Sequence, residues 1–273
     1  MKDRYLRVWI RRSKSKSRCL AKLHHPTVIL MPSTNSQLDS ALSLVDTDKE
    51  GIFMVVATEA EARFQLPWDR FMRLKTAADH LRRLAGERND RLSVLDVGGL
   101  DGALALFLPG YDVELIDPAT TGGSGLNIPC ADRSYEFVVS IDALEHVPPA
   151  DRFRFLSELT RVSESLCLIN IPNPATMPAQ KLVASLTGHP FIKEHVELGL
   201  PERSWIEESF SKLGFSCQLI PSTSLAMWVA QFTLSQVNAE AAEATSRYLV
   251  RAHNEEPFSV PLYYLFIAKR ISN

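Results

Sequence analysis

Short apolar runs and stretches with helical spacing alternate along the middle of the chain. The runs are bounded by glycines, prolines or charged residues, as buried strands are, and they cover 93–97, 112–116, 135–141 and 166–171. Around them, apolar residues recur at three- and four-residue steps, which predicts helices over 67–86, 102–108, 148–162 and 201–213. Strands that alternate with helices favour an α/β fold with a doubly wound, mostly parallel sheet covered by helices on both faces.

The two ends of the chain extend this pattern. The C-terminal part predicts strands at 216–220 and 260–269, the last one antiparallel, and one helix from about 225 to 251. The N-terminal part has two apolar runs that could form strands, at 27–31 and 52–57. We divide the chain into an N-terminal extension, 1–66, and a main domain, 67–273, with a cofactor half at 90–175 and a lid or substrate insertion at 175–200. Because loops over strand ends determine specificity in such folds, we expect substrate choice to depend on this insertion and on the extension.

The most informative segment is the glycine turn after the run at 93–97. Asp96 is followed by Gly98, Gly99 and Gly102, and a helix is expected directly afterwards. Glycines let a ligand approach the backbone, and the start of a helix offers free N–H groups. A carboxylate within that turn would repel a pyrophosphate but would accept hydrogen bonds from a cationic amine. Leu100 takes the middle position of the dinucleotide-binding pattern Gly-x-Gly-x-x-Gly, so the turn predicts a cofactor with an ammonium group.

A second acid, Asp117, stands at the end of the run at 112–116. In a doubly wound fold an acid at this place can accept hydrogen bonds from both hydroxyls of a ribose. The alternative is an aspartate that forms a turn before Pro118.

These residues and two adjoining stretches resemble the class I S-adenosylmethionine-dependent methyltransferases, in particular the methyltransferase type 11 group. The stretches are Leu126-Asn-Ile-Pro-Cys-Ala-Asp-Arg-Ser-Tyr-Glu-Phe-Val-Val-Ser140 and Ile141-Asp-Ala-Leu-Glu-His-Val-Pro148, and the resemblance covers about 80 residues. It implies a Rossmann-like fold. It also implies S-adenosylmethionine as cofactor, S-adenosylhomocysteine as product, the turn of Asp96, Gly98, Gly99 and Gly102 at the methionine end, and Asp117 at the ribose.

The chain departs from the family pattern at three places. Leu100 stands where the family has a glycine, and the segment between Asp117 and Asp132 is too short for a full helix and strand. The adenine-contacting acid, expected near Ser124, is absent, so we expect backbone amides and apolar contacts around Leu126 to hold the adenine.

Three polar residues, Asp142, Glu145 and His146, follow the run at 135–141, where the transferred methyl group should lie. Methyl transfer needs alignment, and a base only when the nucleophile carries a proton. We therefore expect Asp142 and His146 to be catalytic, with His146 as the base. Alternatively, Glu145 and His146 cap the next helix or pair with each other. A metal bound to Asp142, Glu145 and His146 is a further alternative, but we expect no metal. In the insertion, His189 and His195 are expected to be packing or surface residues.

Composition and charge limit the function classes. Apolar residues make up 45% and charged residues 23% of the chain, as in a folded protein with its own core. The four cysteines lie far apart, without metal-ligand spacing, so we expect reduced thiols and a cytoplasmic location. We expect no transmembrane segment, because apolar stretches are too short to cross a bilayer.

The net charge of −2 hides an uneven distribution, since residues 1–22 contain nine Lys or Arg and one acid. Such a basic segment could contact an anionic surface, or simply be solvated; we do not expect nucleic acid as a partner.

The leading hypothesis is methyl transfer from S-adenosylmethionine to an O or N nucleophile of a small molecule or glycan-type metabolite. The alternative is a degenerate methyltransferase-like binding or scaffold subunit without catalysis.

Overall fold

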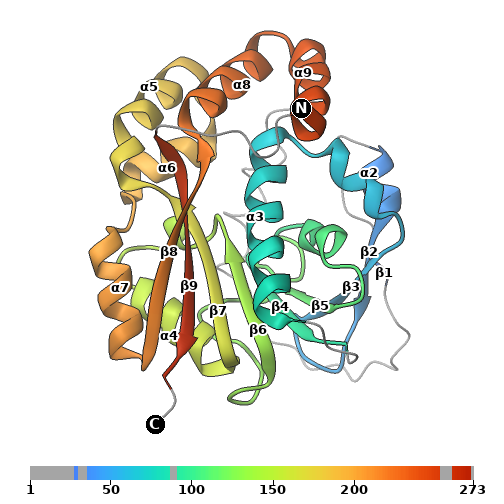
Figure 1. The fold of residues 1–273 in the computed structure, drawn as a ribbon, viewed down its shortest axis with the longest axis vertical. Coiled ribbons are helices and arrows are strands. Elements are labelled where there is room, and N and C mark those ends of the chain that lie inside the picture. The colour runs from blue at the N-terminus through green and yellow to red at the C-terminus, as the bar shows by residue number, and fades with distance from the viewer. Residues whose placement is uncertain (1–27, 30–35, 87–90, 253–259, 272–273) are drawn as a thin grey trace, which may run out of the picture.

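The computed structural model describes residues 28–29, 36–86, 91–252 and 260–271 (Figure 1). The basic segment at 1–22 therefore lies outside the described residues. The strands are β1 Val28–Ile29, β2 Leu42–Asp46, β3 Phe53–Ala57, β4 Ser93–Val97, β5 Asp112–Ile116, β6 Tyr135–Ile141, β7 Ser163–Pro172, β8 Phe215–Ser224 and β9 Pro261–Arg270. The helices are α2 Ser36–Ala41, η1 Ala60–Gln65, α3 Trp68–Ala85, η2 Ala103–Phe107, η3 Leu144–His146, α4 Arg152–Val162, η4 Pro174–Thr176, α5 Met177–Thr187, α6 Pro190–Leu198, α7 Arg203–Lys212, α8 Leu225–Val237 and α9 Ala239–Ala252.

All described strands belong to one sheet, in the order β1-β2-β3-β5-β4-β6-β7-β9-β8. Strands β5, β4, β6 and β7 run parallel, and β9 is antiparallel to both β7 and β8. The predicted α/β fold, a doubly wound and mostly parallel sheet with an antiparallel last strand, is confirmed.

The central strands are apolar on both faces because helices cover both sides of the sheet (Figure 1). Val94 packs in the core on the side of α3, and the next residue, Leu95, packs in the core on the side of α4 and α7. The same alternation continues in β7, where Leu168 and Ile169 belong to opposite cores. A third, smaller core lies where α5, α6 and α8 meet the ends of the strands and includes Val183, Ile192 and Trp228.

The N-terminal extension completes the sheet. Strand β2, which the apolar pattern does not predict, forms a hairpin with β3, and β3 pairs antiparallel with β5. In the usual doubly wound order a strand from the second crossover would lie outside β5. Since the crossover after Asp117 is too short to supply it, a strand from the extension occupies that edge.

Two helical predictions are wrong in detail. The expected helix at 102–108 is a short 3-10 helix, η2, which follows Gly102 in the left-handed conformation. The expected helix at 225–251 is two helices, because Asn238 has extended backbone angles and separates α8 from α9. Asn238 accepts a hydrogen bond from Ala241 N at 3.0 Å through its side-chain oxygen, so it starts the second helix.

Candidate functional site

The acids singled out from the sequence lie at the carboxyl ends of the parallel strands. Asp96 is the residue before the last of β4, Asp117 follows β5, and Asp142 follows β6. Ligands of open α/β sheets bind at this edge. The insertion, now seen as η4, α5 and α6, follows β7 and covers part of the same edge (Figure 1).

Asp96 is buried beneath its own glycine turn. Its side chain is only 2% exposed, and its Oδ1 atom has no hydrogen-bond partner. A Cβ at Gly99 would lie 2.0 Å from Asp96 Oδ2, so only glycine lets the turn close over the carboxyl group. Burial raises the pKa of Asp96 to about 8, and the neighbouring Asp101 and Asp117 raise it too. The sequence predicted a carboxylate open to a cationic amine, whereas in the structure the backbone of the turn covers this carboxyl group.

Asp117 is held by backbone amides of two loops. Its Oδ1 atom accepts from Ala119 N at 2.8 Å and from Thr120 N at 3.1 Å, while its Oδ2 atom accepts from Leu100 N at 3.1 Å. The hydroxyl of Thr120 donates in turn to the carbonyl of Leu100. We call these contacts among Leu100, Asp117 and Thr120 the loop clasp. Asp117 thus forms the turn that the alternative interpretation expected, and its ribose-binding role stays a prediction.

The extension supports the loop clasp from behind. Thr121 Oγ1 donates to the carbonyl of Gly51 at 2.6 Å, in the turn between β2 and β3. Gly51 and Gly123 approach so closely that a Cβ at Gly51 would lie 2.8 Å from Gly123 Cα. Val55 of β3 packs against Gly102, and a Cβ at Gly102 would lie 2.8 Å from Val55 Cγ2.

Leu100 has a strained backbone conformation in the glycine turn. Its φ angle is 58°, in the left-handed region that disfavours residues other than glycine, and its side chain is 44% exposed. Its amide and carbonyl are both used by the loop clasp. The departure from the family glycine therefore keeps the glycine-like conformation and adds a side chain on the surface.

At the other end of the site, Asp142 pairs with an arginine from α3. Arg73 Nη2 lies 3.2 Å from Asp142 Oδ2, and Arg73 Nη1 donates to Asp69 at 2.9 Å and to Tyr263 OH at 2.6 Å. Burial, the largest single cause, would raise the pKa of Asp142, but the charge of Arg73, the neighbouring Glu145 and the two imidazoles together outweigh it and lower the pKa. Asp142 has a φ of 58°, so the backbone is strained at this acid as well.

Glu145 is fully buried next to Asp142. Neither of its carboxyl oxygens accepts a hydrogen bond from any N–H group of the described residues. Burial and the charge of Asp142 raise the pKa of Glu145 well above its ordinary value. The buried carboxyl group of Glu145 is therefore left without a hydrogen-bond partner among the described residues.

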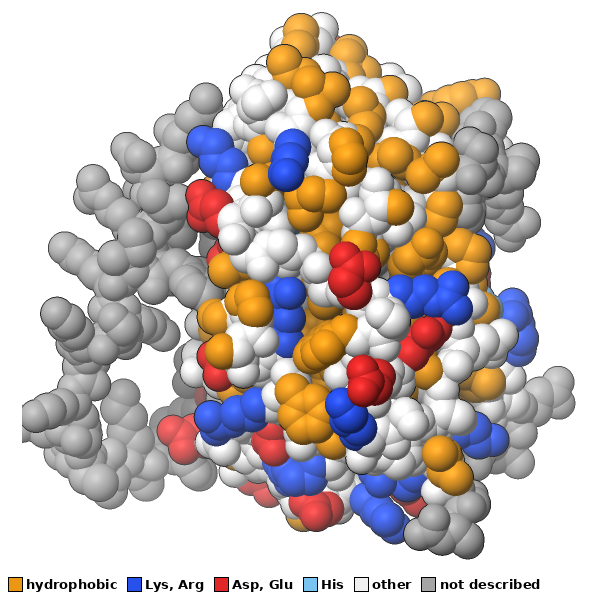
Figure 2. Space-filling model, turned by 90° about the vertical axis from the view of Figure 1, so that its left-hand side faces the viewer, with side chains coloured by type: hydrophobic (Ala, Val, Ile, Leu, Met, Phe, Trp, Pro, Cys, Tyr) orange, Lys and Arg blue, Asp and Glu red, His pale blue; other side chains and the backbone are white. Residues whose placement is uncertain are grey.

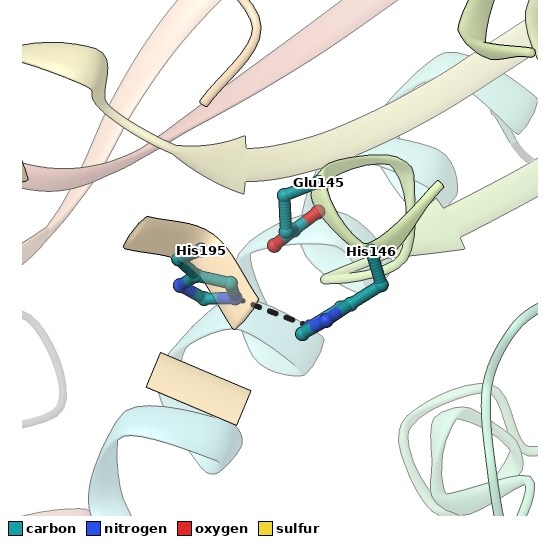
Figure 3. Close-up of side chains that lie close together, drawn as sticks. All are labelled: Glu145, His146 and His195. Carbon is teal, nitrogen blue, oxygen red and sulfur yellow. Dashed lines mark hydrogen bonds between the residues drawn. The ribbon is translucent and has the colours of Figure 1, made fainter. Parts of the chain in front are cut away.

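His146 meets His195 rather than Glu145. The Nε2 atoms of the two imidazoles are 3.1 Å apart (Figure 3). His146 Nδ1 lies 2.8 Å from a carboxylate oxygen of Glu194, and His195 Nδ1 lies 2.7 Å from the side-chain oxygen of Gln180. Burial lowers the pKa of His195 to about 4. His195, expected to be a packing or surface residue, is buried but belongs to the site.

Arg152 fastens this end of the site. Its side chain donates to the carbonyls of Val147 at 3.0 Å and Gly199 at 2.6 Å. It thereby joins the segment after η3 to the C-terminal end of α6, and the two histidines stand on the elements that it joins.

The comparisons with known proteins agree with this architecture. The family model described as "Methyltransferase domain" matches residues 68–232, which is more than half of the chain. The chain belongs to this family. The resemblance to class I S-adenosylmethionine-dependent methyltransferases is confirmed.

Solved structures of other methyltransferases are similar at low sequence identity. A protein assigned as a sarcosine dimethylglycine methyltransferase, from Galdieria sulphuraria, has 15% identity and a TM-score of 0.47 over 75% of this chain and 87% of its own. Magnesium protoporphyrin IX methyltransferase from Synechocystis PCC 6803, with bound S-adenosylmethionine, has 13% identity and a TM-score of 0.45 over 78% of this chain and 90% of its own. A search of curated proteins gave no match.

The residues of this methyltransferase domain fit the family's cofactor at the methionine end. The unpartnered Oδ1 atom of Asp96 is an acceptor without a donor, in a turn that has no room for a Cβ at Gly98 or Gly99. At the ribose end, Asp117 has its acceptors filled by the loop clasp. Leu126, the predicted adenine contact, is partly buried, and its amide donates to Ser124 Oγ at 3.2 Å.

Sequence reasoning missed the residues that reach the methyltransferase site from other elements. Arg73, Arg152, Gln180 and Glu194 carry no motif. For His195 the sequence contains one indication of burial, its position three residues after Ile192, which places both side chains on the buried face of α6. No helix in the part of the chain that the structure describes is both long and apolar enough to span a membrane.

Proposed function

We propose that this methyltransferase domain transfers a methyl group from S-adenosylmethionine to an O or N nucleophile of a small molecule or glycan-type metabolite. The supporting observation is the buried carboxyl group of Asp96, which has an unpartnered oxygen inside a glycine turn at the end of β4. The cofactor supplies an electrophilic methyl group on a sulfonium. Asp96 would accept from its ammonium group, and Asp117 would turn to its ribose hydroxyls.

The acceptor end lies at Asp142 and His146. Transfer to a neutral hydroxyl or amine leaves a proton to be removed, and His146 is the group we propose for that step. The Arg73–Asp142 ion pair positions the backbone just before η3, because it holds Asp142 at a strained φ. The exposed apolar side chains of Leu182, Leu186 and Phe191 lie on α5 and α6, and the ring of Phe191 is 5.5 Å from the ring of His146. Figure 2 views the side of the molecule that is on the left in Figure 1, and it shows apolar side chains gathered in the upper part and most of the charged ones below.

Cofactor binding tests the proposal. S-adenosylmethionine and S-adenosylhomocysteine are titrated into the full chain by calorimetry, and both should bind. Asp96→Asn should weaken binding of S-adenosylmethionine while leaving the circular dichroism spectrum unchanged. Asp132→Asn is the matched control, since its side chain is 74% exposed and it pairs with Arg161 on the surface. Normal binding by Asp96→Asn would refute this placement of the site.

The same experiment has a pH dependence. Asp96 must lose its proton to accept from a cation, so the affinity for S-adenosylmethionine should rise as the pH approaches about 8, where the pKa of Asp96 lies. At higher pH it should fall again, because the α-amino group of the cofactor then loses its own proton. Asp96→Asn should lack this rise. Turnover is then measured with labelled S-adenosylmethionine and fractionated cell extract as the source of acceptor.

The loop clasp favours a second candidate, a methyltransferase-like binding or scaffold subunit without catalysis. Leu100, Asp117 and Thr120 satisfy one another in the place where the ribose should lie. If the native chain bound neither nucleoside at millimolar concentration and Thr120→Ala bound them, the clasp would be what closes the site. If neither the native chain nor Thr120→Ala bound S-adenosylmethionine or S-adenosylhomocysteine, and the chain had a stable protein partner, the scaffold role would be established instead.

A further inference from the structure

The pair of facing histidines raises a question of protons. A neutral imidazole has one N–H and one lone pair, and the partner of one nitrogen fixes which of the two carries the hydrogen. His146 Nδ1 faces a carboxylate oxygen of Glu194 at 2.8 Å, and a carboxylate only accepts. His146 is therefore held with its hydrogen on Nδ1 and its lone pair on Nε2.

His195 is held in the same form by an amide whose orientation is determined. Gln180 Nε2 lies 3.0 Å from Thr176 Oγ1, and that hydroxyl donates to the carbonyl of Asn173 at 2.6 Å. Thr176 Oγ1 must then accept from Gln180, which turns the amide oxygen of Gln180 toward His195 Nδ1 at 2.7 Å. His195 donates through Nδ1, and its lone pair too is on Nε2.

The two lone pairs consequently point at each other across 3.1 Å. A third donor atom, in the carboxyl group of Glu145, lies in the same place. Glu145, His146 and His195 each offer one ligand atom, and these three atoms lie within 4.8 Å of one another (Figure 3). Glu145 is fully buried without an N–H partner. Glu145 and His195 are buried and His146 is partly buried, so a cation between these three electron-pair donors would satisfy them together.

We propose that Glu145, His146 and His195 bind one divalent transition metal ion, of the zinc type. Two Zn–N bonds of about 2.0–2.1 Å at roughly 100° to each other span about 3.1 Å, which matches the separation of the Nε2 atoms. Imidazole and carboxylate are suitable ligands for such an ion. A histidine that binds a metal through one nitrogen usually donates the N–H of the other to an acceptor. Glu194 and Gln180 are such acceptors at Nδ1 of the two rings.

We predicted no metal from the sequence because only Asp142, Glu145 and His146, which are close in sequence, were considered as ligands. The structure replaces Asp142, which pairs with Arg73, by His195 from the insertion. Three protein ligands leave a coordination position open. A His146 that binds the ion through Nε2, with Nδ1 held by Glu194, has no free nitrogen for the base role proposed above, so the two roles of His146 exclude each other.

Metal binding can be measured without any activity. The full chain is stripped with a chelator and titrated with Co²⁺ and with Zn²⁺, following the visible absorption of bound Co²⁺ and its displacement by Zn²⁺. We expect one equivalent of each ion, with no dependence on S-adenosylmethionine. His195→Gln and Glu145→Gln should lose the absorption band. Glu194→Gln, at a half-exposed outer position, should bind about 10- to 100-fold more weakly.

His189→Gln is the matched control. His189 precedes α6 in the same insertion, and its Nδ1 atom has no partner among the described residues, but it is not one of the three converging donors. It should bind Co²⁺ like the native chain. Absence of stoichiometric Co²⁺ and Zn²⁺ binding by the native chain, or native-like binding by His195→Gln, would overturn the proposal and leave the histidine pair bridged by a proton. Neither result would touch cofactor binding at Asp96, which is measured separately.

Discussion

Replacing Asp96 with asparagine should stabilise the protein increasingly as the pH rises. The folded state raises the pKa of this carboxyl from 3.8 to about 8, and the first cause is burial. Between these two values the folded protein holds the proton and the unfolded chain does not. The free energy of unfolding of the native protein must therefore fall with rising pH in this window. Asparagine keeps the shape of the protonated acid and does not titrate.

The size of the effect follows from the same pKa. Each pH unit between about 4 and 8 contributes about 1.4 kcal/mol, so the whole window contributes roughly 5–6 kcal/mol. Solvent screening does not reduce this free-energy difference, because Asp96 is only 2% exposed. Above about pH 8 the carboxylate is ionised in both states, and the difference between variant and native protein should become constant.

Urea denaturation at about pH 5, 6, 7 and 8 measures this difference. Subtracting the native curve from that of Asp96→Asn cancels the groups that both chains share, and the remainder should grow by about 1.4 kcal/mol for each pH unit. Asp132→Asn, which removes an exposed carboxylate, serves as the control. A difference that stays flat across this window, or that shrinks, would refute the argument that the turn buries an uncharged acid.

Three further single variants and one double variant test the site by urea denaturation. Gly99→Ala should destabilise the protein by about 3 kcal/mol or more, because its Cβ would lie 2.0 Å from Asp96 Oδ2; a loss under about 1 kcal/mol would mean that the turn can open. Leu100→Gly should stay within about 1 kcal/mol of the native protein, because relief of the left-handed strain offsets the greater freedom of the unfolded chain, and a large loss would show that the Leu100 side chain packs. Arg73→Met should cost about 3–5 kcal/mol by leaving Asp142 unpaired. Adding Asp142→Asn should recover part of that cost, and no recovery would contradict the ion pair.

Local patterns determined most of the secondary structure in the middle of the chain. Strands β4, β5 and β6 have the predicted bounds, because each is a short apolar run between turn-forming or charged residues. The failures occurred where local patterns are ambiguous. The segment after Gly102 is apolar throughout and too short to distinguish a full helix from the 3-10 turn that forms. Asn238 interrupts a continuous helical pattern with its own side chain as a cap.

The sequence by itself determined the family, the order of the elements and the acids at the strand ends, since these depend on residue types at close spacing. Only the tertiary structure decided what those acids meet. Asp96 is covered by its own turn, Asp117 is engaged by Leu100, and His146 lies against His195, 49 residues further along the chain. Such contacts join helices and strands that approach one another only when both faces of the sheet are packed, and hydrophobic periodicity specifies which face of an element is buried but not which polar group it will find there.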